Sequence, residues 1–169
     1  MPYGWFEAVA AALRRGRAAT TVGFSFGALH TCVAAAKLGC FDAITLVSGP
    51  KSFGILDHNP FGRDLVDTMR LSRHRRRRWT RLGLTLGKRP MPIRCIGDVR
   101  VPIHLIHGDR DWLIHHKQAE AMYARATAPA DLTILAGGFH AEYLVTQMPE
   151  VFLPAVRTWL ERQLAAAPG

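Results

Sequence analysis

Ser25 has the sequence context of a nucleophile, because it lies in a Gly-x-Ser-x-Gly pattern that spans residues 23–27. A β-branched run, 18–24, precedes the serine, and an Ala-rich segment typical of a helix follows it. The pattern predicts a sharp strand-to-helix turn that exposes the serine hydroxyl, with glycines that let strand and helix approach closely. The N–H of Phe26 would then lie at a helix N-terminus, where a backbone donor can stabilise an oxyanion. A glycine-rich turn that only packs the helix on the strand is the alternative interpretation.

Two later loops carry the residue types that activate a serine, an acid and a histidine. Asp109 and Asp111 follow the β-rich run that starts at Val101. His140 follows the β-rich run 131–136, in a loop that begins with two glycines. Because the carboxyl ends of parallel strands meet at one edge of a sheet, we expect these side chains to lie close to the serine.

The surrounding elements alternate between strand and helix, which indicates an α/β fold with a parallel sheet of about four strands and flanking helices. Pro154 cannot sit deep inside the last helix, so we expect a first turn near Glu150 that is separate or kinked. The predicted strands are 18–24, 41–50, a run starting at Val101 and 131–136, and the predicted helices are 5–15, 26–38 closed by Gly39, 115–127 and one ending near Ala165.

The range 51–100 has a different character from the rest of the single predicted domain, 1–169. Glycines and prolines interrupt its weakly amphipathic helical pieces. Such an excursion between two strands predicts a helical cap or lid insertion that shapes a substrate pocket. A surface excursion without a functional role is the alternative.

The motifs resemble those of the α/β-hydrolase superfamily, whose catalytic residues follow the chain order Ser, acid, His. The resemblance covers nearly all of the chain outside the predicted insertion. It implies that Ser25 is the nucleophile, His140 relays its proton, Asp111 orients the imidazole, and the Phe26 N–H contributes to the oxyanion hole. Asp111 is preferred to Asp109, because the family pattern favours the second aspartate and the first can close an Asx-turn. The implied reaction is hydrolysis of an ester, thioester or amide bond in a small-molecule acyl substrate, with no cofactor.

The beginning of the sequence departs from the family pattern. A complete α/β hydrolase of this kind would have several more strands and a His-Gly-type oxyanion loop before the helix at Trp5. The chain is therefore predicted to be N-terminally incomplete, with no identifiable source for a second oxyanion donor. The apolar strand 19–24 would lie at an open sheet edge, so self-association through that edge is expected. The alternative function is a weakly active or inactive hydrolase scaffold that acts as an interaction protein.

Length and composition fit one domain, since 49% of the 169 residues are hydrophobic and can form a sizeable core. No apolar stretch is long enough to span a bilayer, and the N-terminus lacks the basic-then-apolar order of a signal peptide. The three cysteines have no C-x-x-C spacing. We therefore expect a cytoplasmic protein with reduced thiols and no membrane span.

Two further kinds of partner, nucleic acid and metal ions, have to be considered because of the charge and the histidine content. The net charge is +9, and the basic run 74–78 contributes to it. Most such runs are solvated helix faces, so no nucleic-acid partner is expected. Four histidines and two aspartates between His104 and His116 have ligand-type side chains. The odd spacing of His104 and His107 puts them on opposite faces of a strand, so no metal site is expected.

Overall fold

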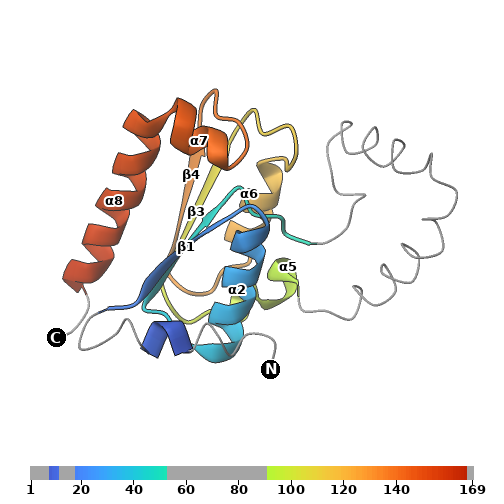
Figure 1. Ribbon diagram of the computed structural model, residues 1–169. Helices are drawn as coiled ribbons and strands as arrows, with labels where there is room; N and C mark the ends of the chain where they lie inside the picture. Colours follow the sequence, from blue (N-terminus) through green and yellow to red (C-terminus); the bar gives the residue numbers. More distant parts are fainter. Residues whose placement is uncertain (1–7, 12–17, 53–90, 167–169) are drawn as a thin grey trace, which may run out of the picture.

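The centre of the structure is a four-stranded parallel sheet (Figure 1). This computed structural model describes residues 8–11, 18–52 and 91–166. The strands lie side by side in chain order, and each pairs in parallel with the next. The predicted α/β class and parallel sheet are therefore confirmed. The strand bounds are Thr20–Phe24 for β1, Ala43–Val47 for β2, Ile103–Gly108 for β3 and Ala130–Leu135 for β4.

Helices cover both faces of this sheet (Figure 1). The helices α2, α5 and α6 lie on one face, and α8 lies on the other. Crossovers between parallel strands are right-handed, so helices that connect strands added in one direction gather on one face. Since α8 follows the last strand, it is free to cover the opposite face. The helix bounds are Phe26–Leu38 for α2, Pro92–Cys95 for α5, Lys117–Tyr123 for α6, Glu142–Gln147 for α7 and Pro149–Ala166 for α8, with a 3₁₀ turn at Ile96–Asp98.

Burial along the strands follows from these layers. Every residue of β2 and β3 is buried, as expected for strands covered on both faces. In contrast, β1 and β4 are the outer strands of the described sheet, and most of their residues are partly or fully exposed.

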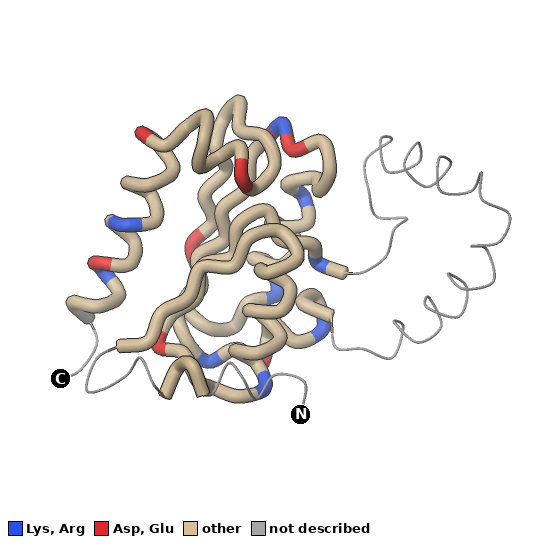
Figure 2. The backbone as a smooth tube through the Cα atoms, viewed as in Figure 1, with Lys and Arg blue, Asp and Glu red and all other residues tan. Residues whose placement is uncertain are grey.

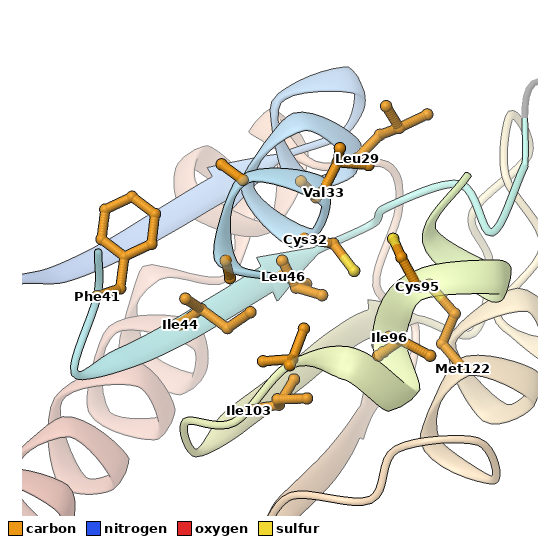
Figure 3. Packing of buried hydrophobic residues seen from close by; sticks show 14 of the residues in the cluster. Leu29, Cys32, Val33, Phe41, Ile44, Leu46, Cys95, Ile96, Ile103 and Met122 are labelled. Atoms are coloured by element: carbon orange, nitrogen blue, oxygen red, sulfur yellow. The ribbon is translucent and has the colours of Figure 1, made fainter. Parts of the chain in front are cut away.

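The larger apolar cluster lies between the sheet and the helices α2, α5 and α6 (Figure 3). All three cysteines are free thiols, and two of them, Cys32 and Cys95, are buried in this cluster. A hydrogen bond with Cys95 and burial raise the pKa of the Cys32 thiol, so this thiol stays protonated and packs as a small apolar group. The second cluster joins the sheet to α7 and α8 through Val47, Ile106, Leu135, Leu144 and Phe152.

The last residues of the predicted insertion belong to the core. The helix α5 and the 3₁₀ turn after it pack against α2, and Cys95, Ile96 and Val99 are buried there. An insertion can therefore extend only to about Pro90. Residues 53–90 lie outside the described residues, so the cap itself stays a prediction.

The helix α8 begins at Pro149 and is continuous through Pro154, so the predicted first turn near Glu150 is not a separate helix. This proline lacks the N–H that would bond to the Glu150 carbonyl, and its ring disfavours a helix interior. Two anchors explain why the helix continues: Phe152 is buried against the sheet, and the indole of Trp159 donates to Asp131 Oδ2 at 2.7 Å. Tertiary packing of α8 here outweighs the unfavourable helix propensity of proline.

The described residues contain as many Lys and Arg as Asp and Glu, and Figure 2 shows both signs distributed over the helices and loops. The whole formal excess of +9 therefore belongs to the segments 1–7, 12–17, 53–90 and 167–169. The basic run 74–78 is among them. None of the helices in the described part is long and apolar enough to cross a membrane.

Candidate active site

Ser25 connects β1 to α2 in a strained backbone conformation, with φ 49° and ψ −117°. Non-glycine residues rarely adopt positive φ, and such strain is concentrated at functional sites. Two backbone hydrogen bonds hold this turn: the Ser25 N–H donates to the Val47 carbonyl at 2.8 Å, and the Ala28 N–H donates to the Ser25 carbonyl at 3.1 Å. The Ser25 side chain makes no capping hydrogen bond to α2. Its hydroxyl is therefore available to a neighbouring side chain.

The two glycines of the Gly-x-Ser-x-Gly pattern are not equivalent. A Cβ on Gly23 would lie 2.6 Å from Thr31 Oγ1 and 2.8 Å from Ala28 Cα, so only glycine fits where α2 crosses β1. A Cβ on Gly27 would meet no described atom within 4 Å. The expectation that glycine allows close approach of strand and helix is confirmed at Gly23 and wrong at Gly27.

A second pair of glycines brings the acid loop and the histidine loop together. A Cβ on Gly108 would collide with the Gly138 carbonyl, and one on Gly138 would lie 3.0 Å from Gly108 Cα. Across this contact the Arg110 N–H donates to the Gly138 carbonyl at 2.9 Å. The Asp109 carboxylate accepts from the Gly137 N–H at 2.7 Å. Asp109 therefore ties the two loops to each other.

Ser25, His140 and Asp111 lie in one chain of hydrogen bonds. His140 Nε2 is 2.9 Å from Ser25 Oγ, and His140 Nδ1 is 2.8 Å from Asp111 Oδ2. A carboxylate only accepts hydrogen bonds, so Nδ1 carries the imidazole proton and Nε2 is left as the acceptor for the hydroxyl. The structure thus brings together the three residues singled out in the sequence.

Asp111 is 3% exposed, and its carboxylate has donors at both oxygens. Oδ1 accepts from the N–H groups of Leu113 at 2.9 Å and Ile114 at 2.8 Å, so Asp111 and not Asp109 closes the Asx-type turn. Burial alone would raise the pKa of Asp111, but hydrogen bonds from His107, His140 and the Ile114 N–H hold this pKa well below its usual range. The carboxylate is ionised at neutral pH.

Ser48 and His107 were not recognised as site residues in the sequence, although both lie at this edge of the sheet. Ser48 follows β2 with φ 48°, and its buried hydroxyl accepts the Ala141 N–H at 3.1 Å. Ala141 itself has φ 33° and directly follows His140. His107 Nε2 lies 3.1 Å from Asp111 Oδ2. The signals were a serine at a strand end and a histidine four residues before an aspartate, and both are too common to identify a role.

Phe26 is the first residue of α2, so its N–H lies beside Ser25 at the positive end of the helix dipole. The first turn of α2 has no acidic side chain to neutralise that end. Phe26 is 52% exposed, and its ring packs edge-on against His30, with 4.9 Å between ring centroids. Negative charge that develops next to Ser25 would be stabilised at this position.

Among the described residues, no three His, Cys, Asp or Glu side chains are arranged to hold a metal ion. His104 bonds Thr133 and stacks on Trp159, whereas His107 bonds Asp111 and Ile114. The two histidines therefore share no partner. A cavity of about 440 Å³ next to His104, between β4 and α8, is not lined by Ser25, Asp111 or His140.

Comparison with solved structures identifies the fold. An α/β hydrolase from the metagenome of sediments of the Mar Chica lagoon, Morocco, superposes with a TM-score of 0.64 at 18% identity, over 95% of this chain and 70% of that one. An esterase from Pyrococcus furiosus gives 0.63 at 18% identity, over 85% and 52%. Acetyl xylan esterase 1 from Thermoanaerobacterium gives 0.60 at 14%, over 82% and 46%. The chain has a partial α/β-hydrolase fold.

No protein-family model and no curated protein matches the sequence. The partial α/β-hydrolase fold spans 52% of the Pyrococcus esterase and 46% of the xylan esterase, so much of each of those chains has no counterpart here. In this fold the serine follows β1, the acid follows β3 and the histidine follows β4. This is the chain order Ser, acid, His that the resemblance implied.

Proposed function

We propose that the chain is a serine hydrolase that cleaves an ester, thioester or amide bond in a small-molecule acyl substrate. The observation that carries the proposal is the unbroken chain of hydrogen bonds from Ser25 Oγ through His140 to the buried Asp111 carboxylate. The strained backbone at Ser25 and the partial α/β-hydrolase fold support it.

The proposed reaction begins when Ser25 Oγ attacks the substrate carbonyl and His140 Nε2 takes its proton. Asp111 holds the ring through Nδ1 and stabilises the imidazolium that forms. The Phe26 N–H donates to the oxyanion of the tetrahedral intermediate. His140 then passes the proton to the leaving group, and water releases the acyl group from Ser25 by the same steps. No cofactor takes part in the proposed reaction.

An oxyanion hole normally has two donors, and the described residues supply one candidate, the Phe26 N–H. Removal of one donor costs about 2.7–4 kcal/mol of transition-state stabilisation. The second candidate function follows from this: a weakly active or inactive scaffold that acts by binding another chain. The observation in its favour is that β1, among the described residues, pairs only with β2 and leaves its other edge open.

A fluorophosphonate probe tests the proposed nucleophile. The folded chain should be labelled at Ser25, and Ser25→Ala should abolish labelling because, among the described residues, no other hydroxyl is bonded to His140. Ser52→Ala is the matched control and should be labelled like the wild type. Equal labelling of Ser25→Ala and wild type would reject the assignment, and no labelling of the wild type would favour the scaffold.

A further inference from the structure

His107 is a fully buried histidine of β3 that the proposed reaction does not use. Its Nε2 lies 2.7 Å from the Ile114 carbonyl oxygen and 3.1 Å from Asp111 Oδ2. Both partners are acceptors, so Nε2 carries a proton and donates to them. Its Nδ1 is buried and has no hydrogen-bond partner among the described residues. A proton at Nδ1 would be an unsatisfied buried donor, so the neutral ring takes the Nε2–H tautomer.

Asp111 receives hydrogen bonds from both sides. Its Oδ1 is held by the N–H groups of Leu113 and Ile114, and its Oδ2 is shared by two imidazoles. His140 approaches Oδ2 at 2.8 Å and also contacts Ser25, whereas His107 approaches at 3.1 Å and reaches no other triad residue in the described contacts. His107 therefore has no route for relaying a proton to the nucleophile.

The Ile114 peptide completes a closed ring of contacts. Its N–H donates to Asp111 Oδ1 at 2.8 Å, and its carbonyl accepts from His107 Nε2 at 2.7 Å. Because His107 is part of the β3 strand, this ring ties the acid turn to the rigid centre of the sheet. The carboxylate is fixed before substrate arrives.

We propose that His107 is a positioning residue for Asp111: its Nε2–H orients Oδ2 toward His140 and limits how strongly the carboxylate attracts the imidazolium. This inference rests on the proposed function, because it assigns His107 a part in the same site. A donor on Oδ2 disperses the negative charge that His140 would otherwise face alone. Without the His107 donor, the Asp111 carboxylate stabilises the His140 imidazolium more strongly. A smaller fraction of His140 is then unprotonated at neutral pH and able to act as a general base.

Among the residues that the structure describes, few charged or titratable groups surround Asp111. His107 on β3 and His140 after β4 contact its carboxylate, and Ser25 contacts His140 from the elbow. The Asp109 carboxylate is engaged by the Gly137 N–H, and His115 lies close enough to His107 to interact with it electrostatically. A variant at position 107 therefore changes one direct donor to Asp111 and leaves the other direct contacts in place.

Three variants separate positioning from packing. His107→Leu keeps much of the volume and removes the donor, whereas His107→Gln keeps an N–H donor. His104→Leu is the matched control, because His104 is 2% exposed on the same strand and contacts Thr133 and Trp159 instead of the triad. The free energy of unfolding by urea is measured for each, so that a loss of stability is not mistaken for a loss of positioning.

The first readout is kcat/KM for p-nitrophenyl acetate as a function of pH. In His107→Leu the acid limb should move up by roughly one pH unit, the effect of one hydrogen bond to a charged group, and kcat should fall while KM changes little. His107→Gln should restore the wild-type acid limb. His104→Leu should lose stability without moving it. An unmoved acid limb in His107→Leu would overturn the proposal.

The second readout does not need turnover. In ¹⁵N-histidine-labelled protein, NMR should show His107 protonated at Nε2 at pH 7.5, and the pH at which the His140 signals change should be higher in His107→Leu than in wild type. If no variant turns over ester but these shifts occur, the proposed function fails and the contact of His107 with the acid stands. A proton on Nδ1 alone, or unchanged His140 signals in His107→Leu, would overturn the inference with or without activity.

Discussion

Asp111 contacts His140 through a single oxygen, and this makes its replacement informative. Asp111→Asn keeps the shape of the side chain but removes the charge that selects the Nδ1–H tautomer of His140. We expect kcat for p-nitrophenyl acetate to fall by on the order of 10⁴, as in other triads that lose their acid, with little change in KM. Steady-state kinetics at pH 8 measures this.

Asp109→Asn is the matched control for that change. Its carboxylate accepts one backbone N–H, from Gly137, and an asparagine amide oxygen can accept the same hydrogen bond. Activity should stay within a few-fold of wild type. A similar large loss in both variants would mean that the second aspartate has no special role and that either substitution disturbs the loop.

The elbow between β1 and α2 is the element that presents Ser25, and its packing depends on one glycine. Gly23→Ala should lower the free energy of unfolding, by about 1–3 kcal/mol as in other overpacked sites, because a Cβ there meets Thr31 and Ala28 at under 3.0 Å. Gly27→Ala has open space and gains helix propensity, so stability should be unchanged or rise by up to about 1 kcal/mol. Urea unfolding monitored by circular dichroism distinguishes the two. Equal effects would contradict this account of the elbow.

The contact between α8 and β3 should weaken in acid because of His104. Burial lowers the pKa of His104 to about 4, with Asp131 opposing and Arg162 adding to this effect. Between pH 6.5 and 4 the unfolded chain binds a proton that the folded chain does not, so the free energy of unfolding falls as the pH falls. The slope from this residue is at most about 1.4 kcal/mol per pH unit.

His104→Leu removes that titration. Its free energy of unfolding at pH 7.5 should be lower than that of wild type, since the hydrogen bond to Thr133 and the stack on Trp159 are lost. Between pH 6.5 and 4 it should then fall less steeply. Parallel pH curves for the two proteins would show that His104 does not cause the acid dependence.

Local patterns predicted the elements that carry the site, and tertiary neighbours decided what those patterns missed. The bounds of α2 follow from the turn at Ser25 and from Gly39, which ends the helix in the left-handed conformation, and both signals lie within a few residues. The continuity of α8 through Pro154 depends on contacts with the sheet. The proposed role of His107 depends on contacts of its ring with Ile114 and Asp111, which form only in the folded loop. No periodic pattern in the sequence predicts these contacts.

At the scale of the whole molecule, β1 is one of the two outer strands, with β4, that the described residues leave unpaired on one side. Among the described residues β1 bonds only to β2, and three of its five residues are half-buried. Unpaired strand edges are templates for pairing with a second chain, and natural proteins blunt them with lysine or proline. The strand, Thr-Thr-Val-Gly-Phe, contains neither residue. This edge is our proposed site of self-association.

We therefore predict that the purified 169-residue chain forms dimers or larger species and turns over p-nitrophenyl acetate weakly, because one oxyanion donor is identified where two are usual. Thr21→Lys on β1 should shift the chain toward monomer, since strand pairing would bury the new charge. Leu164→Lys, at a 48% exposed position on α8 and outside both outer strands, is the matched control and should not change the oligomer. Light scattering after size exclusion measures the mass of each. A monodisperse wild-type monomer with a turnover of about 10 per second, typical of enzymes, would contradict both parts of the prediction.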